Sequence, residues 1–387
     1  MKRICIVRRK YYPWQKNVRR DAEALVKAGY QVDVICTGHK AQKPFEVLNG
    51  VHIYRTITPY NRDNSLLVLY DYITFFILSF LKLTWFDLRK HYAVIEINTM
   101  PDFLVFITVI CRLLGSKVIL YMFEDMPGLF MSSYKVGPQN IGARILRFFE
   151  KWSATYADHV IVSDGLHYKH HLENRGLPPS KITVILNVPD TGVFQSIPPP
   201  ALNAKHPFRI VIVSTLVKRY GVQTVIKAIP FAVKHIPDLI VDIVGDGEYR
   251  PYLQEIAREL QIDKHVHFWG WVEHDNIPGI IARADLGLAP MSDDVGLPNK
   301  LFEYFALGKP AIVSAQPSLI SAFDHNGTVA FFEPDNEVDL ADHIVYLFRN
   351  PEKRKSLVSH GYEFYNTCRW EITQKEYLKV YEELLKP

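Results

Sequence analysis

Apolar residues occur in short runs that alternate with amphipathic stretches along the chain. The first run, ICIVRR at residues 4–9, is followed by VRRDAEALVKAG, in which apolar positions recur with helical spacing up to Gly29. Further runs with the length and composition of buried strands lie at residues 30–38, 92–98, 117–123 and 159–164. Strands that alternate with helices predict a parallel sheet with helices on both faces.

The pattern stops at residues 190–208 and then begins again. This segment contains three consecutive prolines and no periodicity, which is typical of a linker. A second series of apolar runs follows, at residues 209–215, 239–245, 265–272, 285–290 and 310–315. The chain therefore predicts an α/β protein with two Rossmann-like, doubly wound domains that face each other across a cleft at the carboxyl ends of their strands.

Length supports two domains, because 387 residues are too many for one ordinary core. We expect an N-terminal domain at residues 1–190, a linker at 191–207 and a C-terminal domain at 208–370. The last helix, at residues 371–387, is long enough to pack back onto the N-terminal domain.

Charge separates the two halves of the chain. Residues 1–190 carry a net charge of +9 and residues 191–387 a net charge of −5, and the first twenty residues hold eight basic and no acidic side chains. A basic half suggests that the N-terminal domain meets an anionic group, such as a phosphate-bearing substrate or lipid headgroups. Nucleic acid is not expected, because no nucleic-acid-binding module accompanies the charge.

One long apolar segment covers residues 66–86. Asp71 and Lys82 interrupt it and leave ten residues without a charge, whereas a membrane span needs about 20. We expect a helix that is buried or lies on a membrane surface, rather than a spanning helix. No signal peptide is recognisable, and the four cysteines form no C-x-x-C pair, so we expect a cytoplasmic protein. We also expect it to be peripheral at the inner face of the cell membrane and to need no cofactor.

Three loops at strand ends of the second domain carry candidate chemistry. STLVKRYG presents Lys218 and Arg219, GDGEYR places two glycines before a helix, and DDVGLPNK precedes a helix that bears Glu303. Helix-start N–H groups and two cations suit a pyrophosphate. A carboxylate one turn into the helix can accept hydrogen bonds from two adjacent hydroxyls of a ribose. The alternative for Glu303 is a simple partner of the helix dipole.

The segment GLPNKLFEYFALGKPAIVS resembles the donor-binding segment of retaining GT-B glycosyltransferases, particularly those of family 4. The segments HFWGWV and IPGIIARADLGLAPM before it, and YADHVIVSDGLHYKHHLENRGLPPSKITVILNVPDTGVF in the first domain, are similar to the same family. The resemblance implies a GT-B fold and a hexosyltransferase-type activity. It implies a UDP- or GDP-sugar as donor, a lipid-linked or saccharide acceptor hydroxyl, transfer with retention, and a role in surface polysaccharide or glycolipid assembly.

The resemblance also implies roles for single residues. Glu303 matches the second glutamate of the E-x7-E motif, which binds the donor ribose. Residues 296–301 would offer backbone N–H groups to the diphosphate, and Lys218 and Arg219 fall near the basic pair that compensates phosphate charge. The donor-binding residues implied are Glu303, Asn299, Lys300, Leu301, Pro298, Gly296, Asp294, Trp271, Glu273 and Asn187.

Some positions depart from the family pattern. Val295 stands where the first glutamate of E-x7-E is expected, although Asp293 and Asp294 lie beside it and are candidate substitutes. Ser214 and Tyr220 stand at the positions of the usual basic pair, with Lys218 and Arg219 between them. These departures leave the fold and the donor class as predicted, but they change the details of catalysis.

On the acceptor side, Glu124 stands where the family has a histidine, and YPWQKN replaces the usual glycine pair of the first loop. Strand-end positions make Glu124, Asp125 and Asp102 candidates for orienting or deprotonating the acceptor hydroxyl. Arg19 and Arg20 are expected at the mouth of the cleft. Two other functions stay open: a nucleotide-sugar epimerase on the same fold, and a non-catalytic GT-B partner subunit.

Two aromatic clusters have simpler interpretations. His167, His170 and His171 have the helical spacing of a metal site, but without another ligand set nearby we expect a solvated helix face and no metal. Trp269 and Trp271 alternate on a predicted strand, where core packing is expected and contact of Trp271 with a base is the alternative.

Overall fold

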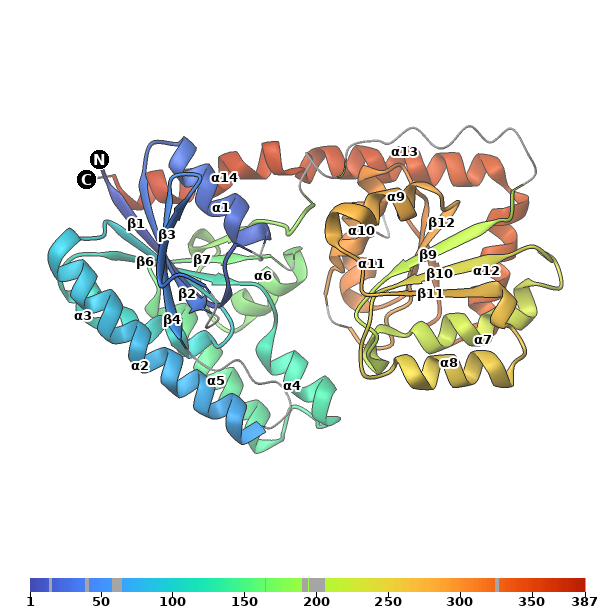
Figure 1. The fold of residues 1–387 in the computed structure, drawn as a ribbon, viewed down its shortest axis with the longest axis horizontal. Helices are drawn as coiled ribbons and strands as arrows, with labels where there is room; N and C mark the ends of the chain where they lie inside the picture. The colour runs from blue at the N-terminus through green and yellow to red at the C-terminus, as the bar shows by residue number, and fades with distance from the viewer. Residues whose placement is uncertain are drawn as a thin grey trace. The chain divides into compact units, whose positions relative to one another are not determined.

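The computed structural model describes residues 1–386 except 14–15, 39–41, 58–64, 164, 190–193, 195–205, 295 and 324–326. The chain forms two compact units (Figure 1). Unit 1 comprises Met1–Asn187 and Glu371–Pro387, and unit 2 comprises Val188–Trp370. Val295 and most of the expected linker lie outside the described residues.

Unit 1 is built on an eight-stranded sheet in the order β3-β4-β2-β1-β5-β6-β7-β8. Its strands are β1 (Arg3–Tyr11), β2 (Gln31–Gly38), β3 (Phe45–Leu48), β4 (Val51–Ile57), β5 (Val94–Asn98), β6 (Lys117–Met122), β7 (His159–Val162) and β8 (Ile182–Val184). The pairs are parallel except for the hairpin of β3 and β4. This hairpin was not predicted, although Asn49-Gly50 at its turn is a strong hairpin signal.

Helices cover both faces of this sheet. They are α1 (Lys16–Lys27), α2 (Ser65–Lys90), η1 (Asp102–Thr108), α3 (Val109–Leu113), α4 (Met126–Tyr134), α5 (Ile141–Tyr156), α6 (Gly165–Asn174) and η2 (Pro179–Lys181). By length and composition, α2 is the one helix of the described residues that could cross a membrane. Only 22% of its most apolar stretch is buried, so the first of the two expected alternatives, a buried helix, is wrong, and a helix on a membrane surface stays a prediction.

The C-terminal helix, α14 (Trp370–Leu384), is held on unit 1 by a buried carboxylate. The hydroxyls of Tyr377 and Tyr381 donate to Glu96 at 2.9 and 2.5 Å, and Glu96 lies in the centre of β5. Burial raises the pKa of Glu96 to about 7, while the tyrosine hydrogen bonds favour its ionised form. The chain thus returns to its first unit after completing the second.

Unit 2 has a parallel six-stranded sheet in the order β11-β10-β9-β12-β13-β14. Its strands are β9 (Arg209–Val213), β10 (Ile240–Val244), β11 (Val266–Gly270), β12 (Leu286–Ala289), β13 (Ala311–Ser314) and β14 (Ala330–Phe332). Its helices are η3 (Lys218–Tyr220), α7 (Val222–Ala232), α8 (Arg250–Glu259), η4 (Asp263–His265), η5 (His274–Asn276), α9 (Ile277–Ala282), α10 (Asn299–Ala306), α11 (Pro317–Phe323), α12 (Glu337–Arg349) and α13 (Pro351–Cys368).

The strand order of each sheet reverses at one place. The switch lies between β1 and β5 in unit 1 and between β9 and β12 in unit 2. In open α/β sheets, ligands bind outside the carboxyl ends of the strands at such a switch point. The residues that follow these four strands are therefore the first candidates for a functional site.

Candidate functional site

Three loops meet at the carboxyl ends of β9, β10 and β12. They are residues 214–220, 245–249 and 290–298. The amide of Leu216 in the first loop donates to the carbonyl of Asp246 in the second at 3.0 Å. The loops are therefore bonded backbone to backbone, which gives this end of unit 2 a defined shape.

Two glycines allow this close approach. A Cβ atom on Gly221 would lie 1.7 Å from the carbonyl oxygen of Pro290, and one on Gly245 would lie 1.9 Å from that of Ser214. Both glycines also have positive φ angles, +68° and +131°. Any side chain at either position would push the loops apart, so the sequence can build this end of the sheet only with glycine.

Helix α10 is fixed against the same switch point by Tyr304. Its side chain is fully buried, and its hydroxyl accepts from the amide of Val213 at 3.1 Å and donates to the carbonyl of Leu288 at 3.2 Å. The ring lies so close to Gly287 that a Cβ atom there would be 2.4 Å away. One residue thus joins α10 to β9 and β12 and holds the first turn of α10 in place.

Glu303 is the fifth residue of α10, one turn after its start, with only 12% of its side chain exposed. Its Oε1 is 3.9 Å from Nε2 of His274 in η5, and the ring of Phe194 packs edge-on against His274 at 5.1 Å. A carboxylate held in this way can accept hydrogen bonds from a ligand next to the helix start. Sequence reasoning missed His274, which no motif singled out.

Lys300 is a buried cation at the same place. It is 8% exposed, its Nζ donates to Oγ of Ser214 at 3.0 Å, and it lies 5.2 Å from the centre of the Tyr220 ring. Burial lowers the pKa of Lys300 to about 8, and the nearby Glu303 raises it in part. Among the described residues no carboxylate lies within 4.0 Å of its ammonium. A buried cation without such a partner is a site prepared for an anion.

The pair Lys218 and Arg219 forms most of η3, beside Lys300. Lys218 is exposed, whereas Arg219 is half-buried with its guanidinium 5.2 Å from the centre of the Tyr220 ring. The carbonyl of Arg219 accepts from the amide of Ser292 at 2.9 Å, which ties η3 to the loop before α10. The structure thus adds Lys300 and Ser214 to the cationic pair that the sequence suggested.

The start of α10 is open to a ligand. The helix begins at Asn299 after Pro298, and no side chain caps it. Gly296 and Leu301 are buried next to it. An uncapped helix start presents N–H groups with a positive partial charge, which suits a phosphate.

The side chain of Asp294 is bonded to the start of α11. Its Oδ2 accepts from the amide of Ser318 at 3.2 Å, and its Oδ1 accepts from the Ser318 hydroxyl. The carboxylate therefore anchors the start of α11, which explains an acidic residue here without a ligand. The expectation that Asp294 stands in for the missing first glutamate thus has no support from its contacts.

The loop after β11 carries the remaining donor-side candidates. Trp271 is 73% exposed and Glu273 is exposed, while Trp269 is 38% exposed and donates from Nε1 to Asp242 at 2.9 Å. The expectation of core packing is wrong for Trp271, whose indole is available to a flat ligand. Asn187 is half-buried and is the last residue of the first stretch of unit 1.

The acceptor-side acids of unit 1 follow β5 and β6. Asp102 is 2% exposed, and its Oδ1 has no hydrogen-bond partner in the described part of the chain. Burial, and then the charge of Asp125, raise the pKa of Asp102 to about 7. Asp125 caps α4 by accepting from the amide of Gly128 at 2.9 Å, and Glu124 is exposed.

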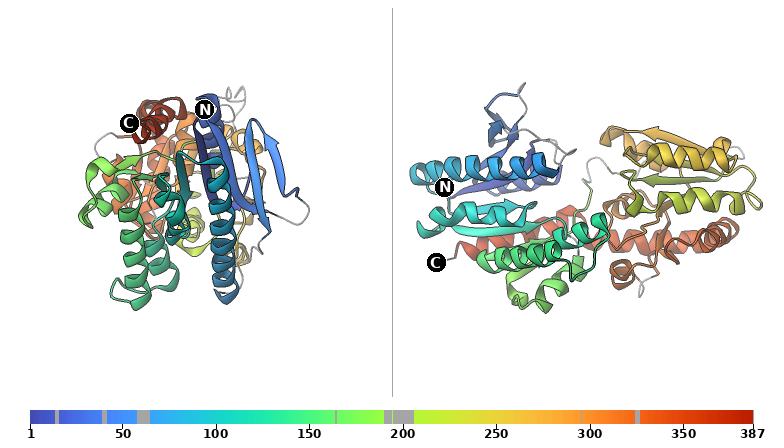
Figure 2. Two further views of the ribbon diagram at one scale, coloured as in Figure 1. Left: turned by 90° about the vertical axis from the view of Figure 1, so that its left-hand side faces the viewer. Right: turned by 90° about the horizontal axis from the view of Figure 1, so that it is seen from below.

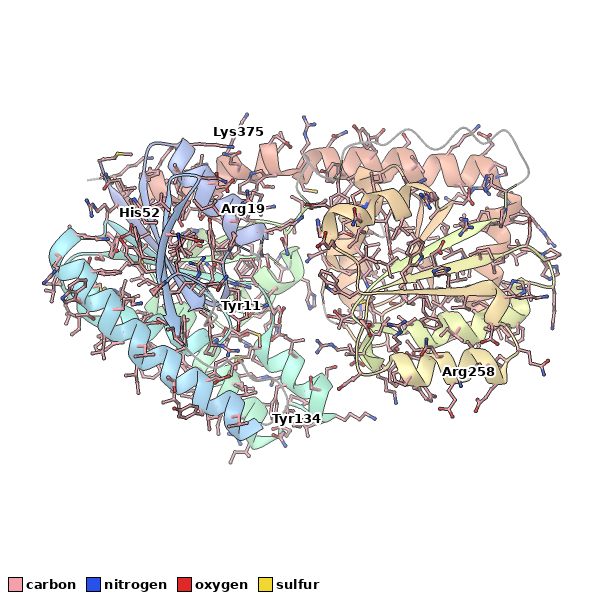
Figure 3. The ribbon with its side chains drawn as sticks, viewed as in Figure 1. Tyr11, Arg19, His52, Tyr134, Arg258 and Lys375 are labelled. Carbon is pink, nitrogen blue, oxygen red and sulfur yellow. The ribbon has the colours of Figure 1, made fainter. Side chains whose placement is uncertain are left out.

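The two arginines expected at a cleft mouth are engaged within α1. Arg19, labelled in Figure 3, pairs with Glu23 at 2.8 Å, and Arg20 is only 9% exposed beside Asp21. Arg8, which the sequence analysis did not single out, lies at the end of β1 instead. It is 5% exposed and donates to the carbonyl of Thr99 at 3.0 Å, and burial lowers its pKa to about 10.

One histidine of the HYKHH segment is not solvated. His167 and His170 are exposed as expected, but a ring nitrogen of His171 lies within 4.8 Å of carboxylate oxygens of Asp125 and Glu150. Arg175 forms an ion pair with Glu150 and supplies the positive charge at this cluster. Its guanidinium neutralises the buried carboxylate, so the contacts describe a charge network.

The whole chain has the fold of several solved glycosyltransferases. Sucrose-phosphate synthase from Thermosynechococcus elongatus matches over 99% of both chains, with a TM-score of 0.80 and 18% identity. Anabaena HepE, solved in complex with UDP-glucose, matches over 99% of this chain and 100% of its own, with a TM-score of 0.74 and 16% identity. Identities this low establish the fold alone.

Two family models cover the two units in turn. Residues 17–192 match Glycosyltransferase Family 4, and residues 194–364 match Glycosyl transferases group 1. The chain belongs to the family-4-type GT-B glycosyltransferases. The predicted family and the predicted fold class are thereby confirmed, as is the pattern of two parallel α/β sheets.

Curated GT-B relatives match a part of the chain. The lipopolysaccharide core biosynthesis glycosyltransferase LpsD of Rhizobium meliloti is 29% identical over 46% of this chain and 49% of its own. A GDP-mannose-dependent phosphatidylinositol monomannoside mannosyltransferase of Mycobacterium tuberculosis is 27% identical over 42% of this chain and 43% of its own. The chain thus spans about half the length of the curated relatives it matches.

Proposed function

We propose that this GT-B protein transfers a sugar from a nucleoside diphosphate sugar to an acceptor hydroxyl, with retention of configuration. The observation that carries the proposal is the group at the switch point of unit 2. A carboxylate, Glu303, and a buried cation, Lys300, which has no carboxylate within 4.0 Å among the described residues, lie one turn apart at an uncapped helix start. A nucleotide offers the complementary set, a ribose diol and a diphosphate.

In this proposal each side chain has a separate task. Glu303 accepts hydrogen bonds from the ribose hydroxyls, and the N–H groups at the start of α10 meet the diphosphate. Trp271 supplies an exposed ring for the base. His274 lies beside Glu303 and orients its carboxylate.

The resemblance implied that Lys300 binds the donor, but it did not supply the role of its ammonium. The sequence has Ser214 and Tyr220 where the family has a basic pair, and the ammonium of Lys300 lies 3.0 Å from the first and 5.2 Å from the ring of the second. We infer that this ammonium, with Lys218 and Arg219, stabilises the negative charge that develops on the leaving diphosphate. The added cation, Lys300, comes from α10, whereas Lys218 and Arg219 come from the loop after β9.

The acceptor is proposed to meet unit 1. Asp102 is buried at the carboxyl end of the sheet with its pKa raised to about 7 by burial, and Glu124 and Asp125 follow the next strand. A carboxyl group that titrates near neutrality can exchange a proton with a hydroxyl. The relatives named for lipopolysaccharide and phosphatidylinositol mannoside synthesis favour a saccharide or lipid-linked acceptor.

The test is ligand-induced thermal stabilisation by UDP-, GDP-, dTDP- and ADP-sugars. We expect one nucleotide class to stabilise the wild-type protein, and Glu303→Ala and Lys300→Met to lose that stabilisation by at least tenfold in affinity. Asp294→Asn serves as a control, because the carboxylate of Asp294 is already bonded to Ser318. A folded wild-type protein that responds to no nucleotide would contradict the proposal and favour a non-catalytic partner subunit.

A further inference from the structure

Helix α2 exposes apolar side chains and buries its acidic ones, whereas a helix that faces water does the reverse. The side chains of Asp71, Ser79 and Asp87 are at most 2% exposed, so its acidic residues point inward. The exposed side chains are almost entirely apolar: Leu67, Leu69, Tyr70, Ile73, Ile77, Leu78, Leu81, Trp85 and Leu88. A helix on a water-exposed surface has polar residues outside and apolar residues inside, so this face of α2 is suited to an apolar environment.

The apolar surface continues from α2 through η1 to α5. The ring of Phe103 in η1 lies 6.2 Å from Phe76 of α2 and 5.9 Å from Phe149 of α5. Phe106 of η1 packs against Trp152 of α5 at 4.6 Å. Figure 2 shows the two long helices of unit 1 that this row of aromatic rings connects.

Helix α5 exposes four more large apolar side chains on one side. They are Ile141, Ile145, Phe148 and Trp152, of which Phe148 is 61% and Trp152 is 51% exposed. We call the exposed apolar side chains of α2 and α5 together the apolar face. It spans two helices that are far apart in the sequence, which distinguishes it from scattered surface residues.

The charges at the apolar face are positive. Arg144 and Lys151 are exposed on the same side of α5, and Arg89 is exposed near the end of α2, where it stacks on Trp85 at 4.0 Å. The one acidic residue of α5, Glu150, is fully buried. Within the described residues of α2 and α5 no carboxylate is exposed beside these cations, so they complement an anionic surface, whereas a second copy of this chain would place them facing each other.

We propose that the apolar face of α2 and α5 docks unit 1 onto an anionic lipid bilayer, with Trp85 and Trp152 at the headgroup level and Arg144 and Lys151 on lipid phosphates. Indole rings and cations prefer this depth of a bilayer. The proposal does not depend on donor binding, because every residue of the apolar face belongs to unit 1.

The helix lies on the bilayer and does not cross it. Phe75 and Leu83 of α2 are fully buried in the core of unit 1 together with residues of β1 and β5. A spanning α2 would remove these side chains from that core and carry Asp71 and Asp87 into hydrocarbon, at a cost of several kcal/mol.

Sedimentation of the full-length protein with vesicles tests this proposal. We expect binding to vesicles of phosphatidylcholine with phosphatidylglycerol, weaker binding without phosphatidylglycerol, and a loss of affinity at high salt. Ile77→Glu and Trp152→Glu should each weaken binding at least tenfold. The double variant Arg144→Ala, Lys151→Ala should lose about tenfold or more on anionic vesicles alone.

Controls separate this surface from a folding defect and from the donor site. Tyr346→Glu in unit 2 introduces the same charge at a side chain that is 51% exposed, as Trp152 is, and should bind vesicles like the wild type. All variants should keep their nucleotide response. The proposal would be overturned if the wild type did not bind vesicles, or if Tyr346→Glu lost as much vesicle binding as Trp152→Glu. It would also be overturned if the protein stayed in the membrane after alkaline carbonate extraction. The same holds if the wild type formed a dimer in place of binding vesicles and Trp152→Glu dissociated that dimer.

Discussion

The two units use the same kind of sheet but place opposite chemistry at its switch point. In unit 2 a buried cation, Lys300, has no carboxylate within 4.0 Å among the described residues, and burial lowers its pKa. In unit 1 a buried acid, Asp102, has an oxygen without a hydrogen-bond partner in the described part of the chain, and burial raises its pKa. Burial makes the charged form costly in both, so each site favours a ligand that compensates: an anion for the lysine and a hydroxyl for the acid.

The two units also differ in where their exposed apolar side chains lie. The exposed apolar side chains of unit 1 concentrate on α2 and α5, whereas those of unit 2, such as Tyr252, Trp271, Tyr346 and Tyr362, lie on different elements. The N-terminal half is also the basic half. The two proposals therefore assign an anionic, partly apolar environment to unit 1 and a small charged ligand to unit 2.

The largest effect is expected at Asp102. Its pKa is 3.8 in the unfolded chain and about 7 in unit 1, so the folded state keeps a proton that the unfolded state loses as pH rises between these values. Stability from this group therefore falls between pH 4 and 7, by roughly 4 kcal/mol in total. Asp102→Asn removes the titration, and hydrogen exchange of the amides of β1 and β5 across this pH range measures the difference.

The expected result is a gap between the two proteins that changes with pH. Relative to the variant, the wild-type unit 1 should become less stable as pH rises to 7, and β9 and β10 of unit 2 should show no such change. If the stabilities of the two proteins changed with pH in parallel, Asp102 would be hydrated or hydrogen-bonded. Unit 1 would then have no buried acid to contrast with Lys300 of unit 2.

Lys300→Met should give an effect of opposite sign with pH. The lysine has a pKa of 10.5 when unfolded and about 8 in unit 2, so below pH 8 it is charged in both states and its burial costs about 3 kcal/mol. Methionine has a similar shape without the charge, so the variant should be more stable at pH 7. The advantage should shrink between pH 8 and 10.5, as the folded wild type loses its proton.

The same variant should bind the donor nucleotide more weakly, which separates a functional site from a packing defect. Calorimetry in buffers of different ionisation enthalpy adds a direct reading: near pH 8 the wild type should take up a proton when the diphosphate binds, because the anion raises the pKa of Lys300. If Lys300→Met lowered stability and left nucleotide affinity unchanged, the lysine would be a structural residue.

Much of this contrast could be predicted from the sequence. Apolar runs predicted both parallel sheets, and the position of Glu303 one turn into a helix after Gly-Leu-Pro predicted its place at the switch point. These features depend on short-range patterns. The hairpin of β3 and β4 was equally readable from Asn49-Gly50, and a search for that dipeptide would have found it.

The remainder depends on side-chain contacts between distant segments. Lys300 reaches Ser214 across 86 residues, and no local pattern reveals that its ammonium lies near η3. Asp294 bonds to Ser318, and Arg20 to the adjacent Asp21, which redirects two candidate ligands to structural tasks. The apolar face likewise needs η1 to join two helices that the sequence separates.

The smallest effect is expected at Trp271, and it tests unit 2 without disturbing its stability. The indole is 73% exposed, so Trp271→Ala removes little buried surface and should leave the unfolding free energy within about 0.5 kcal/mol. If the ring stacks on the base, nucleotide affinity should fall about tenfold. Trp269→Ala is the matched control on the same strand end: it removes the hydrogen bond to Asp242, so it should lower stability and spare affinity. If Trp271→Ala and Trp269→Ala had the same nucleotide affinity, the base would not stack on Trp271. Glu303 and Lys300 would then define the donor site without an aromatic ring.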